Sequence, residues 1–247
     1  LYQLHEMTHA ALAPIRASAL ANRLWLENPW NPLGYTYQGK IALAACEVFE
    51  RLTRHYGKPS FGIDSVRVRG MPVQVIEEIT HTKPFAELLH FKKHSEIPGL
   101  LKPQPKVLLV APMSGHYATL LRGTARALLE DHDVYITDWR DAREVPLALG
   151  QFDLEDFIDY LIEFIKTIGP NVHVIAVCQP GPAVMAATSL MAADDDPMTP
   201  ASMTLMGSPI DTRLSPTEPN RLATSRPLEW FENNVINYVP FPHAGVI

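Results

Sequence analysis

The sequence contains 247 residues, of which 47% are hydrophobic and 19% charged, a composition typical of a soluble protein with a substantial core. Its formal net charge of -6 and the lack of a Lys/Arg run argue against a nucleic-acid partner, which would need a basic face. Two cysteines do not make a disulfide framework, no stretch reaches the roughly 18 apolar residues of a membrane span, and the start shows no secretory signal. We therefore expect a cytoplasmic protein.

The first 60 residues predict two helices joined by an aromatic loop. Apolar residues recur at spacings of three and four over residues 2–26, where Pro14 should interrupt the helix, and over residues 37–56. Cys46, among small residues of the second helix, is expected to belong to the core. We expect the aromatic residues of the loop to pack internally, and the alternative is an adhesive surface for an apolar partner. That surface would consist of Trp25, Trp30, Tyr35 and Tyr37.

The opening sequence also contains the spacing of a zinc motif. His5-Glu6-Met7-Thr8-His9 fits H-E-x-x-H, which on a helix would place two imidazoles on one face with the glutamate as general base. Such a site needs a third protein ligand and a buried helix, whereas this motif lies where helices commonly fray. We interpret these residues as the solvated face of an amphipathic helix and expect no metal.

From residue 64 the pattern changes to strands. Two runs, SVRV at 65–68 and VQVIEEI at 73–79, flank Arg69-Gly70 and predict two antiparallel strands joined by a tight turn. Residues 83–101 mix apolar and charged side chains, so we expect a loop with one helical turn there.

The rest of the sequence alternates between strands and helices. Short apolar runs predict strands at 106–112, 133–138, 172–177 and 203–206. Helical spacing is clearest over residues 153–168, where Asp153 can cap the helix and Asp156 stands three residues further on. This alternation predicts an α/β fold with a mostly parallel sheet and helices on both of its faces.

Cys178 lies where an apolar strand gives way to a helix. In the G-x-S-x-G nucleophile elbow of α/β-hydrolases, small residues allow a sharp turn that lifts the nucleophile above the sheet. Here Ala176, Cys178 and Pro180 occupy the three fixed positions, with Gly181 one place later. The helix N-terminus would favour a thiolate, so Cys178 is a candidate nucleophile. The alternative is a buried small hydrophobe.

Ligands of such sheets collect at the carboxyl ends of the strands. An oxyanion hole would combine the backbone N–H of Gln179, directly after the candidate nucleophile, with that of Met113 or Ser114 in the loop after residues 106–112. The two aspartates that flank Arg140 follow another strand, and we expect an ion-paired loop there.

Five separated stretches resemble one family in the same order. They are LLVAPMSGHYATLLRGT, VYITDWRDAREVPL, AVCQPGPAVMAA, TLMGSPIDTR and SRPLEWFENNVI. They resemble the intracellular poly(3-hydroxybutyrate) depolymerases, which are α/β-hydrolases with a cysteine nucleophile. The resemblance extends over the whole sequence and implies an α/β-hydrolase-type fold in three parts. These are an N-terminal helical segment (1–60), an incomplete hydrolase core (61–211) and the start of a cap (212–247).

The resemblance implies hydrolysis of the storage polyester on cytoplasmic granules, with Cys178 as nucleophile and no metal or prosthetic cofactor. The expected partner is the polyester granule surface, and no oligomeric state is implied. Residues 228–239 place apolar side chains along one helical side, a face suited to a hydrophobic polymer. The cap residues expected to meet substrate are Trp230, Phe231 and Tyr238.

In this family an acid and a histidine follow the nucleophile and the cap, so we expect them beyond Ile247. The in-chain alternative combines Cys178 with Asp211 and His243, although Asp211 could equally pair with Arg213. Thiolysis by coenzyme A instead of water stays open. Two further functions are alternatives to hydrolysis. One is a polyhydroxyalkanoate synthase-like acyltransferase, which is disfavoured because both elbow glycines are replaced, and the other is a non-catalytic granule-binding protein.

Overall fold

The computed structural model describes residues 2–113, 117–237 and 239, and the chain divides into two compact units. Within these ranges, the first unit comprises the residues up to Gly57 together with Asn237 and Val239, and the second runs from Lys58 to Ile236. None of the helices in the described part of the chain is long and apolar enough to cross a membrane. The expected boundaries at residues 60 and 211 remain predictions.

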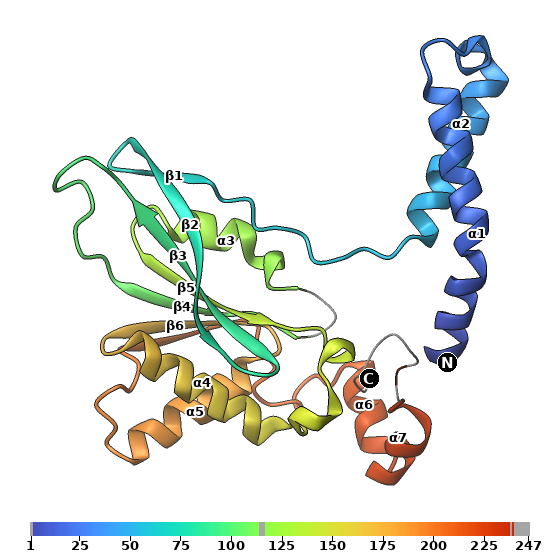
Figure 1. Cartoon of the computed structure of the whole chain (residues 1–247). Coiled ribbons are helices and arrows are strands. Elements are labelled where there is room, and N and C mark those ends of the chain that lie inside the picture. The colour runs from blue at the N-terminus through green and yellow to red at the C-terminus, as the bar shows by residue number, and fades with distance from the viewer. Residues whose placement is uncertain (1, 114–116, 238, 240–247) are drawn as a thin grey trace. The chain divides into compact units, whose positions relative to one another are not determined.

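The first unit is a helical hairpin whose two long helices lie side by side (Figure 1). Its elements are α1 (Tyr2–Glu27), the 3-10 helix η1 (Pro32–Tyr35) and α2 (Tyr37–Thr53). The expected interruption at Pro14 is wrong, because α1 continues through it. Proline removes one backbone donor, and the other hydrogen bonds of a 26-residue helix hold the helix together. Cys46 also departs from expectation, since it is only half-buried.

The second unit contains a seven-stranded sheet with the order β1-β2-β3-β5-β4-β6-β7. Its strands are β1 (Ser65–Val68), β2 (Met71–Thr82), β3 (Ala86–His94), β4 (Lys106–Val110), β5 (Asp133–Trp139), β6 (Val172–Val177) and β7 (Ser202–Met206). Strands β4 to β7 pair in parallel, whereas the pairs β1–β2, β2–β3 and β3–β5 are antiparallel. Five of the seven strands therefore run in one direction, which confirms the mostly parallel α/β fold.

The turn between β1 and β2 is the tight turn that the sequence predicts. Arg69 and Gly70 both have positive φ, 53° and 80°, the combination that matches the twist of a two-residue hairpin. The loop expected over residues 83–101 is wrong, because strand β3 occupies nine of these 19 residues and pairs with β2 and β5 on its two sides. Its charged residues find partners there: the Lys93 ammonium donates to the carbonyl of Leu129 at 2.7 Å.

Helices cover both faces of this sheet (Figure 1), with α3 on one face and α4 and α5 on the other. The helical elements are η2 (Ala118–Leu121), α3 (Arg122–Leu128), η3 (Ala142–Glu144), η4 (Leu147–Leu149), α4 (Leu154–Ile168), α5 (Gly181–Ala193), α6 (Glu218–Ser225) and α7 (Leu228–Asn234). Asp153 caps α4 by accepting from the N–H groups of Glu155 and Asp156, and the Asp156 carboxylate accepts from the N–H of Asp153. The predicted capped helix is therefore confirmed.

The core of the second unit lies between the sheet and these helices. Strand β4 at its centre is almost wholly buried, as are the inward side chains of α4. Trp139 at the end of β5 meets Phe157 of α4 edge to face, with ring centroids 4.7 Å apart, and its indole N–H donates to the carbonyl of Ala111 at 2.8 Å. The carboxyl ends of β4 and β5 are thus fixed by packing and by a buried hydrogen bond.

Candidate active site

The strand order places a topological switch point at the carboxyl ends of β4 and β6. From β4 the chain crosses to β5 on one side and later returns to β6 on the other, so the connections leave over opposite faces. Open α/β sheets bind ligands at such a switch point. Val110 and Ala176 are paired in register, so the residues that follow the two strands emerge at the same level.

Cys178 forms the sharp turn between β6 and α5. Its φ of 66° is in the left-handed region, which non-glycine residues rarely adopt, at a typical cost of about 1–3 kcal/mol. The backbone holds this conformation in place: the Cys178 N–H donates to the carbonyl of Met206 at 2.8 Å, and its carbonyl accepts from the Gly181 N–H at 3.3 Å. The residue is exposed, and its thiol has no hydrogen-bond partner among the described residues.

Small residues around Cys178 allow this turn, as in a nucleophile elbow. Ala176 is fully buried two residues before it. On the other side the close approach occurs at Gly181, where a Cβ atom would lie 2.2 Å from the Cβ of Ser208. Gly181 therefore provides the space that the motif assigns to its second glycine, one position later than usual. Ser208, which follows β7, contributes a buried hydroxyl with no hydrogen-bond partner in the described part of the chain.

Gln179 is involved in both candidate oxyanion donors: its own backbone N–H is one, and its side chain binds the other, the N–H of Met113. The Gln179 backbone N–H has no acceptor among the described residues, as expected of a free donor beside a nucleophile. The N–H of Met113, after β4, donates to the side-chain Oε1 of the same Gln179 at 3.1 Å. An amide oxygen thus occupies the second donor, a contact that sequence spacing alone could not reveal. Ser114 lies outside the described residues.

The candidate acid Asp211 is held by a neighbouring arginine. Its two carboxylate oxygens accept from Nε and Nη2 of Arg213, both at 2.8 Å, and the Arg213 backbone N–H donates to Oδ1 at 3.1 Å. These hydrogen bonds lower the pKa of Asp211. The pairing is the alternative that the sequence left open for Asp211, and His243 lies outside the described residues. No histidine or carboxylate is paired with the thiol of Cys178 in the part of the chain that the structure describes.

The aspartates around Arg140 do form ion pairs, but not with it. Arg140 Nη2 contacts Glu87 Oε1 at 2.5 Å, so its partner lies on β3 instead of in its own loop. Asp141 pairs with Arg143 at 2.5 Å. Asp138 is buried and pairs with Lys58, and burial raises the pKa of its carboxyl group although the lysine opposes this effect.

The start of the expected cap contains an aromatic pair. Trp230 and Phe231 meet edge to face at 5.1 Å between ring centroids, and the guanidinium of Arg226 lies 5.5 Å from the Trp230 ring centroid. Helix α7 ends at Asn234, earlier than the helical pattern of residues 228–239 suggests. Tyr238 lies outside the described residues.

The H-E-x-x-H residues lie on α1 and face other groups. The His9 ring stacks on His55 at 3.6 Å between centroids, and its Nε2 lies 3.4 Å from Nη1 of Arg16. The described residues include no group of three His, Cys, Asp or Glu side chains that could hold a metal ion. His9 is therefore packed against the residues that follow α2 instead of being fully solvated, and the expectation of no metal stays a prediction.

The sheet and the turn at Cys178 are consistent with an α/β-hydrolase-type fold. The comparison with protein families adds a second line of evidence: residues 207–247 match the family described as PHB de-polymerase C-terminus, where PHB is poly(3-hydroxybutyrate). This match supports a relationship to the PHB depolymerases and a role in PHB degradation. No curated protein sequence matches the chain.

Proposed function

We propose that this protein hydrolyses poly(3-hydroxybutyrate) through a covalent thioester on Cys178. The observation that carries the proposal is the left-handed backbone of an exposed cysteine between β6 and α5, with a φ of 66°. A structural cysteine gains nothing from that strained position, whereas a nucleophile is presented to substrate by it. The family match at residues 207–247 supports the choice of polyester as substrate.

In this mechanism Cys178 Sγ, deprotonated by a histidine that the described residues do not place, attacks the carbonyl carbon of an ester unit. The carbonyl oxygen becomes an oxyanion and takes hydrogen bonds from backbone N–H groups. Collapse of the intermediate breaks the ester C–O bond, and the leaving alkoxide takes the proton from the histidine and becomes a hydroxyl group. Water then cleaves the thioester, which releases a hydroxyacid or a short oligomer and restores the thiol.

The side chain of Gln179 enters this scheme as the resting occupant of one oxyanion donor. Its Oε1 accepts from the Met113 N–H at 3.1 Å, while the Gln179 backbone N–H stays free among the described residues. A substrate carbonyl that uses both donors must displace the amide oxygen. Because one carbonyl acceptor replaces another, the exchange costs little net hydrogen bonding.

The proposal is tested by trapping the acyl-enzyme on the thiol. A rapid acid quench during incubation with p-nitrophenyl 3-hydroxybutyrate should leave Cys178 labelled, seen by peptide mass spectrometry, with an initial burst of nitrophenol equal in amount to the label. Cys178→Ala should remove the label and lower turnover of amorphous poly(3-hydroxybutyrate) by about a thousandfold or more, because only binding and oxyanion contributions remain.

Cys46→Ala is the matched control, since Cys46 is the other cysteine of the sequence and is only half-buried. It should leave labelling and turnover unchanged. Cys178→Ser should be severely impaired, because the base is matched to a more acidic nucleophile. Full turnover by Cys178→Ala would remove the nucleophile assignment, and transfer of hydroxyacyl groups from coenzyme A onto polymer would favour a synthase-like acyltransferase.

A further inference from the structure

The loop end of the hairpin exposes a group of large apolar side chains, here called the aromatic tip. Each of its members is more than half exposed, and Trp30 is 92% exposed. The aromatic tip consists of Trp25, Trp30, Leu33, Tyr35 and Tyr37. Single exposed apolar residues are ordinary on protein surfaces, but five within 13 consecutive positions form a patch of the kind that marks an interaction site.

Polar side chains of this loop bind its own backbone, while the rings are exposed. Asn31 is 8% exposed, and its side chain donates to the Trp25 carbonyl and accepts from the Leu33 N–H, both at 3.0 Å. Asn28 accepts from the N–H of Trp30 at 3.0 Å. The loop is therefore held mainly by polar side chains on backbone groups. Among the tip residues, the Tyr35 hydroxyl adds one contact by donating to the Pro29 carbonyl at 3.3 Å.

Two glycines make the same loop compact. A Cβ atom at Gly34 would lie 2.2 Å from the carbonyl oxygen of Leu26, and one at Gly39 would lie 1.8 Å from that of Leu33. The Thr36 hydroxyl closes the loop by donating to the Leu33 carbonyl at 2.7 Å. A loop fixed in this way loses little conformational freedom when its side chains bind a surface.

Charge and hydrogen-bonding capacity identify the chemistry of the partner. Between Trp25 and Ile41 the only charged residues are Glu27 and Lys40, and the Glu27 carboxylate is already paired with Arg23 at 3.0 Å. A tip without excess positive charge has no electrostatic attraction to anionic lipid or nucleic acid. The indole N–H groups of Trp25 and Trp30 have no acceptor among the described residues, so they can donate to a partner.

We propose that the aromatic tip docks the protein onto its polyester, through the uncharged surface that ester carbonyls and aliphatic carbons form. Such a surface offers apolar area to the rings and acceptors to the indole N–H groups, with no charge to be neutralised. This inference rests on the proposed function for the identity of the polymer. It assigns binding to residues of the hairpin, and the chemistry to Cys178 of the sheet unit.

The test measures co-sedimentation of the chain with amorphous poly(3-hydroxybutyrate) particles, in a Cys178→Ala background so that binding is separated from turnover. Trp30→Ser together with Tyr37→Ser should weaken binding by about tenfold or more, because the two substitutions remove the apolar area of two large rings from the contact. Leu52→Ser is the matched control: Leu52 lies on the same hairpin, outside the tip, and is 80% exposed. It should bind as the parent does.

Binding should also be insensitive to salt and weaker on polystyrene particles, which offer no ester carbonyls. Unchanged binding by the double variant, with circular dichroism showing intact helices, would overturn the inference. So would preferential, salt-sensitive binding to anionic vesicles, or a concentration-dependent dimer that the tip substitutions abolish. Loss of the acyl label at Cys178 without loss of particle binding would overturn the proposed reaction alone, so the two failures are distinguishable.

Discussion

The two units of this chain use apolar residues in opposite ways. In the sheet unit, the side chains of Leu108, Leu161 and Phe164 are completely buried. In the hairpin, Ala19 is the only buried apolar side chain among those the structure describes, and many larger apolar residues are exposed. The sheet unit is thus stabilised by hydrophobic burial, whereas the hairpin presents its apolar surface outward.

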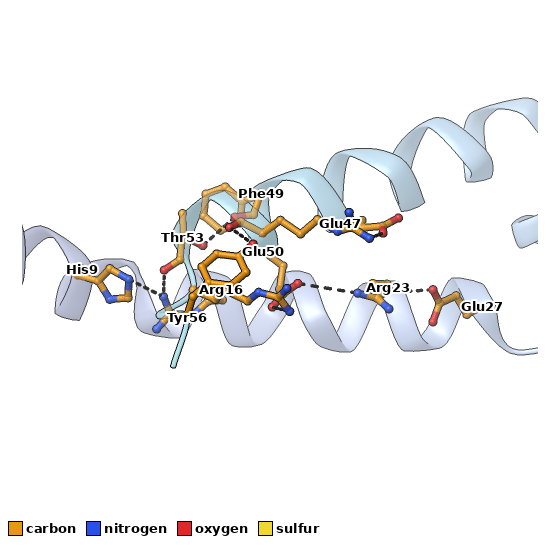
Figure 2. A network of polar contacts seen from close by, with 11 residues as sticks. His9, Arg16, Arg23, Glu27, Glu47, Phe49, Glu50, Thr53 and Tyr56 are labelled. Atoms are coloured by element: carbon orange, nitrogen blue, oxygen red, sulfur yellow. Dashed lines mark hydrogen bonds and ion pairs between the residues drawn. The ribbon is translucent and has the colours of Figure 1, made fainter. Parts of the chain in front are cut away.

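Polar contacts between its helices hold the hairpin instead (Figure 2). Arg23 of α1 reaches Glu27 on its own helix at 3.0 Å and Glu50 of α2 at 3.8 Å, and Arg54 contacts the same Glu50 at 3.6 Å. Arg16 of α1 donates to the carbonyl of Thr53, near the end of α2. Exposed and half-exposed ion pairs are each worth about 1 kcal/mol or less, so the hairpin should be the less stable unit.

The largest expected effect comes from the same truncation made once in each unit. Leu161→Ala, at a position with no exposed surface, should lower the free energy of unfolding of the sheet unit by about 2–5 kcal/mol, because it removes buried methyl groups and leaves a cavity. Leu52→Ala on α2 should change stability by less than about 0.5 kcal/mol. Denaturant unfolding followed by peptide-level hydrogen exchange measures each unit separately.

Equal losses for the two leucines would break the comparison, since they would mean that Leu52 is covered in solution. A small loss for Leu161 would instead mean that the sheet core repacks around the missing group. The exchange data decide between these outcomes, because protection of residues 154–168 reports the sheet unit and protection of residues 37–53 reports the hairpin.

A smaller effect is expected from Gly39→Ala, which tests close backbone packing in the hairpin. A Cβ at this position would overlap the Leu33 carbonyl oxygen at 1.8 Å, so overpacking should cost about 1–3 kcal/mol. Alanine's better helix propensity returns only about 1 kcal/mol. Hydrogen exchange should therefore quicken in residues 37–53. Gly123→Ala in α3 is the control, because nothing lies within 4 Å of its Cβ position, and that variant should be neutral or slightly stabilised.

The comparison also explains which parts of the fold could be predicted from sequence. Strand β4 and helix α4 carry their signals locally, as an apolar run and as the Asp153 cap with an apolar stripe. Strand β3 carries no such local signal. Its polar side chains fit because distant groups bind them: the Asp133 carboxylate lies 2.7 Å from the His90 ring, and the carbonyl of Leu129 accepts from Lys93. Partners so remote in sequence cannot be inferred from spacing.

The candidate site shows the same division. The elbow at Cys178 was predicted because strand, turn and helix signals are contiguous there, and the role of Gly181 could be suspected one place from its usual position. The contact between Gln179 and Met113 joins segments 66 residues apart and depends on a side-chain rotamer. For the aromatic residues of the hairpin loop, the expectation of internal packing is wrong, and the exposed surface that the sequence left as the alternative is what the structure shows. Apolar periodicity normally indicates burial, so the pattern alone could not decide between the two.

The smallest expected effect is a loss of hairpin stability at low pH, caused by the pair of histidines formed by His9 of α1 and His55, which follows α2. His9 lies in a stack with His55 at 3.6 Å and beside Arg16, and burial, followed by these two neighbours, lowers the pKa of His9 below its ordinary value of 6.5. The folded hairpin therefore binds the proton less readily than the unfolded chain does. Its stability is complete above about pH 6.5 and falls as the pH drops through the lowered pKa of the folded state.

His9→Gln should remove this contribution, because an amide keeps a polar side chain at the position without titrating. Helix protection in residues 2–53, measured by hydrogen exchange at pH 8 and pH 5, should fall more in the parent chain than in the variant, with both alike at pH 8. The strands of the sheet unit serve as the internal control and should respond equally in the two proteins. An identical acid response of the hairpin in the parent chain and in His9→Gln would mean that His9 is solvated in the folded state. The polar contacts of Figure 2 would then hold the helices together with no contribution from the protonation of His9.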